Sequence, residues 1–217
     1  MRTFVKFCGI TDPSVLEEVR PEEGAIGLVV EVPRSPRTLT VERAREIAEA
    51  VPPPLEVWAV LVDPPTDLVH EAFDTVGVDW VQLHGTIPGG LDAVERHRII
   101  PSVPIPSGPE PPVLPPAFDD ADFRRIHIDT ADGERAGGTG RPPHWPTCAQ
   151  LVDRLAGRKA ILAGGLTPET VGEAIRTVRP WGVDVSTGIE SRPGVKDPER
   201  MRRFLEAVRA AEEARGA

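Results

Sequence analysis

The feature that most constrains the fold is a series of eight short apolar runs, separated by segments with helical periodicity. The runs are mostly continuous rather than alternating, which favours parallel strands buried on both faces. Eight strands alternating with helices predict a (β/α)8 barrel or a doubly wound α/β sheet. The predicted strands are Thr3–Cys8, Ala25–Val30, Val57–Val62, Trp80–Leu83, Ile99–Ile105, Arg125–Asp129, Lys159–Ala163 and Val183–Ser186.

Several predicted helices have recognisable starts. A capping residue followed by proline, the preferred first helical residue, occurs at Thr11-Asp12-Pro13, Thr167-Pro168 and Asp197-Pro198. Apolar residues also recur at helical spacing between Val41 and Val51, which indicates a further amphipathic helix. These segments fall between predicted strands, as the alternating pattern requires.

Proline interrupts the pattern in one place. The chain has 25 prolines, and eight of them lie between Pro101 and Pro116. The fifth helix of a barrel should fall within Pro101–Asp122, but proline breaks regular helices. We therefore expect an irregular, proline-rich fifth βα unit, with no helix of three or more turns across Pro109–Pro116.

Composition narrows the class of protein. A chain of 217 residues is long enough for one well-buried domain, and we expect residues 1–217 to form a single barrel. The net charge of -9 argues against a nucleic-acid partner, and no apolar run is long enough to span a membrane. Met1–Phe7 reads as a strand and not as a signal peptide, so we expect a cytoplasmic protein. Cys8 and Cys148 are far apart, which indicates neither a zinc site nor a disulfide framework.

Polar residues and glycines gather where the predicted strands end. In a barrel this end carries the functional groups. Taken singly, each has a plain structural explanation: a lone cysteine is usually a small buried hydrophobe, and Gly-Gly is usually a tight turn. Their joint position at the same end of successive strands is what predicts a site. The segments are Cys8, Arg37, His84-Gly85, Asp129, Gly137–Gly140, Gly164-Gly165 and Asp184–Glu190.

Together these segments resemble the phosphoribosylanthranilate isomerase family. The matching strings occur in family order and extend from the first strand to the last helix. They depart from the family pattern at Thr86-Ile87-Pro88, at Thr187 and in the fifth unit. The strings are Lys6–Thr11 (KFCGIT), Ser35–Arg37 (SPR), Val81–Gly85 (VQLHG), Gly137–Gly140 (GGTG), Ala163–Leu166 (AGGL) and Asp184–Glu190 (DVSTGIE).

The resemblance implies a single-domain (β/α)8 TIM barrel that performs an Amadori rearrangement on N-(5-phosphoribosyl)anthranilate. The furanose ring opens after an acid protonates its oxygen, and a base then removes the proton from C2. By resemblance Asp129 is the acid and Cys8 is the base, with no metal and no cofactor. Cys8 needs nearby positive charge to ionise, whereas Asp129 needs burial or a negative neighbour to stay protonated.

The resemblance also implies how the sugar-phosphate substrate is held. Arg37 offers a planar fork to the anthranilate carboxylate, and His84 and Asp184 orient the substrate. Backbone N–H groups of glycine-rich loops bind the phosphate. His127 and the other histidines outside the matched motifs have no expected role. The expected oligomeric state is a monomer or a homodimer. The expected phosphate-binding residues are Gly138, Thr139, Gly140, Gly164, Gly165, Ser186, Thr187 and Gly188.

Two other functions fit parts of the pattern. A dual-substrate isomerase would also act on the analogous histidine-pathway aminoaldose, but such enzymes usually carry aspartate where Cys8 ends the first strand. A non-catalytic barrel would bind a sugar phosphate or a protein without turnover. The presence of both Cys8 and Asp129 argues against this second alternative.

Overall fold

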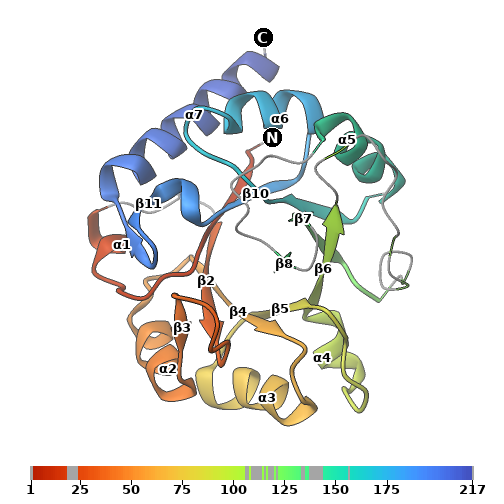
Figure 1. Cartoon of the computed structure of the whole chain (residues 1–217). Coiled ribbons are helices and arrows are strands. Elements are labelled where there is room, and N and C mark those ends of the chain that lie inside the picture. Colours follow the sequence, from red (N-terminus) through yellow and green to blue (C-terminus); the bar gives the residue numbers. More distant parts are fainter. Residues whose placement is uncertain are drawn as a thin grey trace.

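The computed structural model describes residues 2–18, 24–105, 108, 114, 116, 120, 122–132, 135–136, 144–155 and 157–216. Within these residues a ring of parallel strands is surrounded by helices (Figure 1). The strands are β1 Phe4–Cys8, β2 Gly24–Val30, β3 Thr38–Leu39, β4 Glu56–Val62, β5 Trp80–His84, β6 Ile99–Ile105, β7 Arg125–Asp132, β8 Arg135–Ala136, β9 Lys159–Leu162, β10 Gly182–Val185, β11 Glu190–Arg192 and β12 Val195–Lys196. The helices are α1 Val15–Glu18, α2 Val41–Ala50, α3 Thr66–Glu71, the π-helix η1 Ala72–Val76, α4 Ala93–His97, α5 Trp145–Arg154, α6 Val171–Val178, the 3-10 helix η3 Thr187–Ile189 and α7 Pro198–Gly216.

The ring runs in the order β1-β10-β9-β7-β6-β5-β4-β2, and β1 also pairs with β2, which closes it. Strand β1 shows the closure: Lys6 pairs with Asp184 of β10 on one side, and Cys8 pairs with Gly27 of β2 on the other. All eight predicted strands are present among the described residues, and each begins within one residue of its predicted start. The closed barrel is therefore confirmed over the doubly wound sheet.

The helix starts agree with the sequence pattern in part. Helix α7 begins at Pro198, and the Asp197 carboxylate accepts from the Glu199 N–H as a cap. Helix α1 begins at Val15 instead of Pro13, because the Asp12 carboxylate accepts from the Ser14 N–H and folds these residues into a local turn first.

Helix α6 also begins later than Pro168 suggests, at Val171. The Thr167 N–H donates to the Thr170 hydroxyl, and these residues form a turn ahead of the regular helix. The Val171 N–H nevertheless reaches back to the Thr167 carbonyl, so helical winding starts close to the predicted residue.

The proline-rich segment is described only at its start. Strand β6 continues through Pro101 and Pro104, which pair with Leu83 of β5 and Asp129 of β7. Residues 101–105 are therefore strand, as predicted. Most of the region from 106 to 121 lies outside the described residues, so the absence of a long helix across Pro109–Pro116 stays a prediction.

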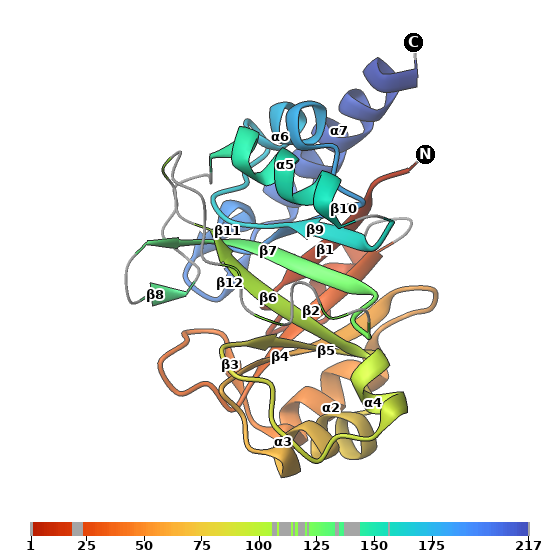
Figure 2. The same cartoon turned by 90° about the vertical axis from the view of Figure 1, so that its right-hand side faces the viewer.

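The end of the barrel where the strands begin is closed by aromatic rings. Phe4, Trp58 and Ile100 belong to a small buried cluster that also includes Ala25 and Ile161, with Trp80 and Trp181 packed against it. The Arg125 guanidinium lies 3.9 Å from the centroid of the Trp80 ring and donates two hydrogen bonds, of 2.6 and 2.9 Å, to the Glu56 carboxylate. The opposite end, where β8, β11 and β12 lie, is the mouth (Figure 2). None of the helices in the described residues has the length and apolarity needed to cross a membrane.

Candidate active site

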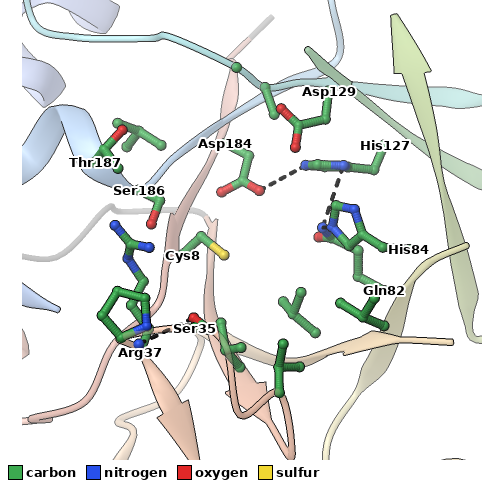
Figure 3. Close-up of a pocket in the computed structure, with 18 of the residues that line it drawn as sticks. Cys8, Ser35, Arg37, Gln82, His84, His127, Asp129, Asp184, Ser186 and Thr187 are labelled. Carbon is green, nitrogen blue, oxygen red and sulfur yellow. Dashed lines mark hydrogen bonds and ion pairs between the residues drawn. The ribbon is translucent and has the colours of Figure 1, made fainter. Parts of the chain in front are cut away.

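A cavity of ≈ 850 Å³ opens at the mouth of the barrel. It collects nearly all the described residues that the sequence assigns to a site, and Figure 3 shows several of them pointing into it. Gly188 lines a smaller adjoining cavity that shares Gly165 and Thr187 with the first. Gly138, Thr139 and Gly140 lie outside the described residues. The predicted residues that line the main cavity are Cys8, Arg37, His84, Asp129, Gly164, Gly165, Asp184, Ser186 and Thr187.

Four strand ends share a repeating pattern of side chains. In each, two polar residues separated by one apolar residue face the barrel interior, because side chains along a strand alternate between its two faces. The apolar residues between them, Phe7, Leu83, Ile128 and Val185, join the core beneath the helices. The polar pairs are Lys6 and Cys8, Gln82 and His84, His127 and Asp129, and Asp184 and Ser186.

The site therefore has two layers. The upper layer consists of Cys8, His84, Asp129 and Ser186, and the lower layer consists of Lys6, Gln82, His127 and Asp184. Sequence motifs assign roles to all four upper residues and, in the lower layer, to Asp184. The lower residues are buried, and they lie deeper in the barrel than the upper layer, so they form the floor of the site.

The lower layer is held by hydrogen bonds around the Asp184 carboxylate. Asp184 Oδ2 accepts from Lys6 Nζ at 2.8 Å and lies 2.9 Å from His127 Nε2. His127 Nδ1 is in turn 2.9 Å from the Ser102 hydroxyl. Burial opposes ionisation of Asp184, but the Lys6 charge and the bond from His127 outweigh it and lower its pKa to about 2. Burial would likewise lower the pKa of Lys6, but Asp184 keeps it raised above its ordinary value.

Cys8 lies directly above this ion pair. Burial and the Asp184 charge raise the pKa of its thiol, while the ammonium groups of Lys6 and Lys196 oppose that rise. Gly27 on β2 leaves room for the arrangement, because a Cβ there would lie 2.9 Å from both Cys8 Sγ and Lys6 Nζ. The base candidate is thus a thiol whose pKa is raised, with cations close enough to favour its ionisation.

His84 is a neutral group in this setting. Burial, followed by the neighbouring His127 and Lys6, lowers the pKa of His84 to about 3. Its Nε2 lies 2.9 Å from the Gln82 amide nitrogen. Its ring packs edge-on against the His127 ring, with 5.7 Å between the two ring centroids. His84 can therefore exchange hydrogen bonds with a ligand at neutral pH but brings no positive charge.

One edge of the Arg37 guanidinium is occupied by an ion pair within the protein. Its Nε and Nη2 donate to the two Glu190 carboxylate oxygens, each at 2.7 Å. Lys196 Nζ approaches the same carboxylate at 2.8 Å. Two cations thus share one buried anion, which leaves a net positive charge beside the cavity. A carboxylate in the cavity would meet Arg37 on its Nη1 edge.

Two glycine-bearing loops meet beside the cavity, after β9 and after β10. Gly164 and Gly165 have positive φ angles of 88° and 61°, which only glycine adopts readily. Gly188 packs on the first loop so closely that a Cβ would lie 2.0 Å from the Leu166 carbonyl oxygen. Backbone at this junction is accessible at close range, which is the arrangement that barrels use to bind phosphate.

One group of described residues has the spacing of a metal site. His84, His127 and Asp129 each bring one ligand atom within 4.8 Å of the others, and imidazole with carboxylate suits a transition metal. Both ring nitrogens of His127, however, are engaged by Asp184 and Ser102. Coordination through His127 would therefore break one of these bonds.

Sequence reasoning identified Asp184 but missed the other three residues of the lower layer and the anion that holds Arg37. Lys6, Gln82 and Glu190 stand inside the matched motifs, but neither they nor His127 carry an expected role. A signal was present: each lower-layer residue precedes an upper-layer residue by two positions at the end of a strand. That spacing places both side chains on the inward face.

With the geometry established, comparison with known proteins identifies the family. Residues 5–207 match the family model described as N-(5'phosphoribosyl)anthranilate (PRA) isomerase. The chain belongs to this isomerase family. An N-(5'-phosphoribosyl)anthranilate isomerase of Haloferax volcanii is 39% identical, over 99% of the chain and 96% of the relative. One from Halorhodospira halophila is 38% identical, over 98% of the chain and 100% of the relative.

Solved structures of phosphoribosylanthranilate isomerases show the same barrel. The enzyme from Thermotoga maritima superimposes with a TM-score of 0.78 at 31% identity, covering 96% of this chain and 99% of that one. Another structure, with a TM-score of 0.73 and 30% identity, covers 96% of this chain and 99% of its own. It is a complex with reduced 1-(o-carboxyphenylamino)-1-deoxyribulose 5-phosphate. The TIM barrel expected for an isomerase of this family is thus confirmed.

Proposed function

We propose that the chain converts N-(5-phosphoribosyl)anthranilate to 1-(2-carboxyphenylamino)-1-deoxyribulose 5-phosphate, an aldose–ketose isomerisation of tryptophan biosynthesis. The observation that carries the proposal is the presence of Cys8 and Asp129 in one cavity at the mouth. They come from β1 and β7, which are separated in the ring by β10 and β9. A substrate between them would have one proton donor and one proton acceptor, which the rearrangement requires.

In the proposed mechanism Asp129 donates its proton to the furanose ring oxygen. The bond between that oxygen and C1 breaks, and the electrons of the glycosidic nitrogen form a Schiff base. The Cys8 thiolate then takes the proton from C2, and the electron pair released neutralises the iminium nitrogen to give an enolamine. The enolamine tautomerises to the ketone. No electron leaves or enters the substrate, so the residues need only move protons.

Charge near Cys8 supports its assignment as the base. A thiol must lose its proton before it can accept one from C2, and burial opposes that loss. Lys6 and Lys196 act in the opposite direction, since both cations stabilise the thiolate. Lys6 is fixed by its ion pair with Asp184 at 2.8 Å, so its position does not depend on the substrate.

The two anionic ends of the substrate fit different parts of the cavity. The anthranilate carboxylate would bind the Nη1 edge of Arg37, whose other edge is fixed by Glu190. The phosphate would bind backbone N–H groups of Gly164-Gly165 and Ser186–Gly188, where glycine permits close approach. Asp184 and His84 would bind hydroxyl groups between these ends. Gly138–Gly140 remain proposed phosphate ligands on the resemblance alone.

The test is turnover of freshly prepared phosphoribosylanthranilate, followed by the loss of anthranilate fluorescence. We expect turnover that persists after treatment with a chelator. Cys8→Ser and Asp129→Asn, purified in the same way, serve as controls for contaminating activity. The histidine-pathway aminoaldose, offered in parallel, tests the dual-substrate alternative. A folded wild-type protein that binds the product analogue without turnover would contradict the proposal.

A further inference from the structure

His127 is a buried polar side chain that the proposed acid–base chemistry does not use. Its side chain is 2% exposed, at the centre of the barrel two residues before Asp129 on β7. Figure 3 shows its ring between Asp184 and the His84–Gln82 pair. A buried imidazole on an inward strand face requires hydrogen-bond partners, and both ring nitrogens of His127 have them. Nε2 faces Asp184, whereas Nδ1 lies 2.9 Å from the Ser102 hydroxyl and 3.4 Å from the Gln82 amide nitrogen.

The identity of these partners fixes the protonation of the ring. Asp184 is held ionised, with a pKa of about 2, so its oxygens can only accept hydrogen bonds. His127 Nε2, 2.9 Å from Asp184 Oδ2, must therefore carry a hydrogen. The Ser102 hydroxyl can rotate to donate to Nδ1 at 2.9 Å. A hydrogen on Nε2 and a lone pair on Nδ1 satisfy both contacts.

The two oxygens of Asp184 differ as a result. Oδ2 accepts from both Lys6 and His127, whereas Oδ1 is buried without a hydrogen-bond partner in the protein. Asp184 lines the cavity. An unpaired buried carboxylate oxygen is costly, and a donor on a bound molecule would satisfy it.

Lys6 alone would not hold the carboxylate in one orientation. An ammonium group is a compact charge that accepts a range of approach angles. A second donor on the same oxygen, from a ring locked between Ser102 and Asp184, restricts rotation about the last side-chain bond. Carboxylates commonly orient imidazoles in this way. Here the imidazole orients the carboxylate.

We propose that His127 is a positioning residue for the isomerisation: it fixes Asp184 so that Oδ1 faces the cavity and accepts a hydrogen bond from a hydroxyl of the sugar-phosphate substrate. The inference rests on the proposed function, because that function supplies the hydroxyl. His127 touches neither the ring oxygen nor C2 in this scheme. It acts through Asp184.

The test replaces His127 by two amide side chains that differ only by one methylene group in length. In His127→Gln the amide nitrogen can occupy the place of Nε2 and donate to Asp184. In His127→Asn the amide is shorter and reaches only the place of Nδ1. Loss of an orienting partner typically costs about 10–100-fold. We expect the Asn variant to lose that much in kcat/KM, mainly through KM, and the Gln variant to stay within about threefold of wild type.

Binding is measured separately by calorimetry with reduced 1-(2-carboxyphenylamino)-1-deoxyribulose 5-phosphate, and thermal unfolding checks that both variants fold. The dissociation constant should rise about 10–100-fold for Asn and little for Gln. Wild-type binding of the analogue without turnover would defeat the proposed function while the Gln–Asn comparison still tests His127. Equal affinities in wild type, Gln and Asn, or equal losses in both variants at unchanged Tm, would overturn the inference.

A substrate-free measurement tests the geometry itself. In wild-type protein, ¹⁵N NMR of the His127 ring should show a protonated Nε2 and an unprotonated Nδ1. Asp184→Asn removes the charged acceptor and should shift the Nε2 signal. Ser102→Ala is the matched control, because it removes the nearer of the two partners of Nδ1 and leaves the Asp184 contact in place. A ring protonated only on Nδ1 would contradict the inference.

Discussion

The two ends of the barrel each bury a cation among inward-facing side chains, but the cations have different kinds of partner. At the closed end, Arg125 makes two hydrogen bonds to Glu56 and lies within 5.5 Å of the centroids of four aromatic rings. At the mouth, Lys6 pairs with Asp184, yet one Asp184 oxygen has no partner. At each end one of these charged residues has a buried atom without a hydrogen-bond partner, Arg125 Nε at the closed end and Asp184 Oδ1 at the mouth. Of these two residues, Asp184 lines the main cavity and Arg125 does not.

The difference separates stability from function on the same strands. Strand β1 contributes Phe4 to the closed end and Cys8 to the mouth, and β7 contributes Arg125 and Asp129 in the same way. Side chains near the strand starts fill space, and those near the strand ends leave it open. Changes at the mouth should therefore reduce turnover with little loss of stability, and changes at the closed end should do the reverse.

The largest effect should come from the proposed acid and base. Cys8→Ser and Asp129→Asn should each lower kcat by about 10²–10⁴-fold, because neither replacement can exchange a proton at the required pKa. The double variant should lose less than the product of the two. Steady-state kinetics with product trapping provides the measurement. Full kcat in Cys8→Ser would show that the base lies elsewhere.

Removal of the cation at the closed end should act on stability instead. Arg125→Met keeps the hydrocarbon stem but removes the stacking on Trp80 and the bonds to Glu56. We expect the free energy of unfolding to fall by about 2–3 kcal/mol, since Glu56 is partly exposed and can be rehydrated. Lys159→Met, whose exposed ammonium group lies over Trp181, is the control and should cost less than about 1 kcal/mol.

Denaturant unfolding measures both stability variants, and their kcat at a permissive temperature should match wild type. A normal free energy of unfolding in Arg125→Met, or a selective loss of kcat, would break the division between the two ends.

Arg37 should affect binding more than turnover. Arg37→Ala removes the proposed carboxylate contact, which exists in the bound substrate and in the transition state alike, so KM should rise about 10–100-fold. Arg37→Lys should recover only part of this, because an ammonium group cannot hold Glu190 on one edge and a ligand on the other. Initial rates over a wide substrate range separate the two constants. A fall in kcat at unchanged KM would assign Arg37 to the chemical step.

The pH dependence of Cys8 should give the smallest effect. Its folded pKa is raised above the ordinary thiol value, so the thiolate grows with pH throughout the neutral range. Alkylation by iodoacetamide should accelerate about tenfold per pH unit from 7 to 8.5, without a plateau. Cys148 should not react, because it is buried with a pKa raised to about 12. A rate that levels off below pH 8 would place the Cys8 pKa lower.

The strands were predictable because each is a local pattern. A continuous apolar run marks a buried parallel strand wherever it occurs, so all eight starts were found. The starts of α1 and α6 were less accessible, since Asp12 and Thr170 form side-chain turns that compete with the helix over only a few residues. Motif residues at strand ends were found for the same local reason.

The contacts within the lower layer were not predictable, although Asp184 itself was, because they depend on closure of the ring. Lys6 and Asp184 are 178 residues apart and meet only when β1 pairs with β10. His127 and Ser102 lie on neighbouring strands, and nothing in either segment names the other as a partner. The bidentate contact of Arg125 with Glu56 crosses 69 residues in the same way. A sequence shows which residues a strand contains, but the barrel decides which of them meet.

Gly27 gives this dependence a practical form. A single methyl group at this position would compete for the space of Cys8 Sγ and Lys6 Nζ without removing any reactive atom. The spacing between base and cation is thus controlled from the adjacent strand by the smallest possible side chain. Gly27→Ala would therefore change the distance between the thiol and the ammonium group while keeping both groups. Shortening the Lys6 side chain in the same protein would relieve the crowding, and the two rates together would show how strongly turnover depends on that distance.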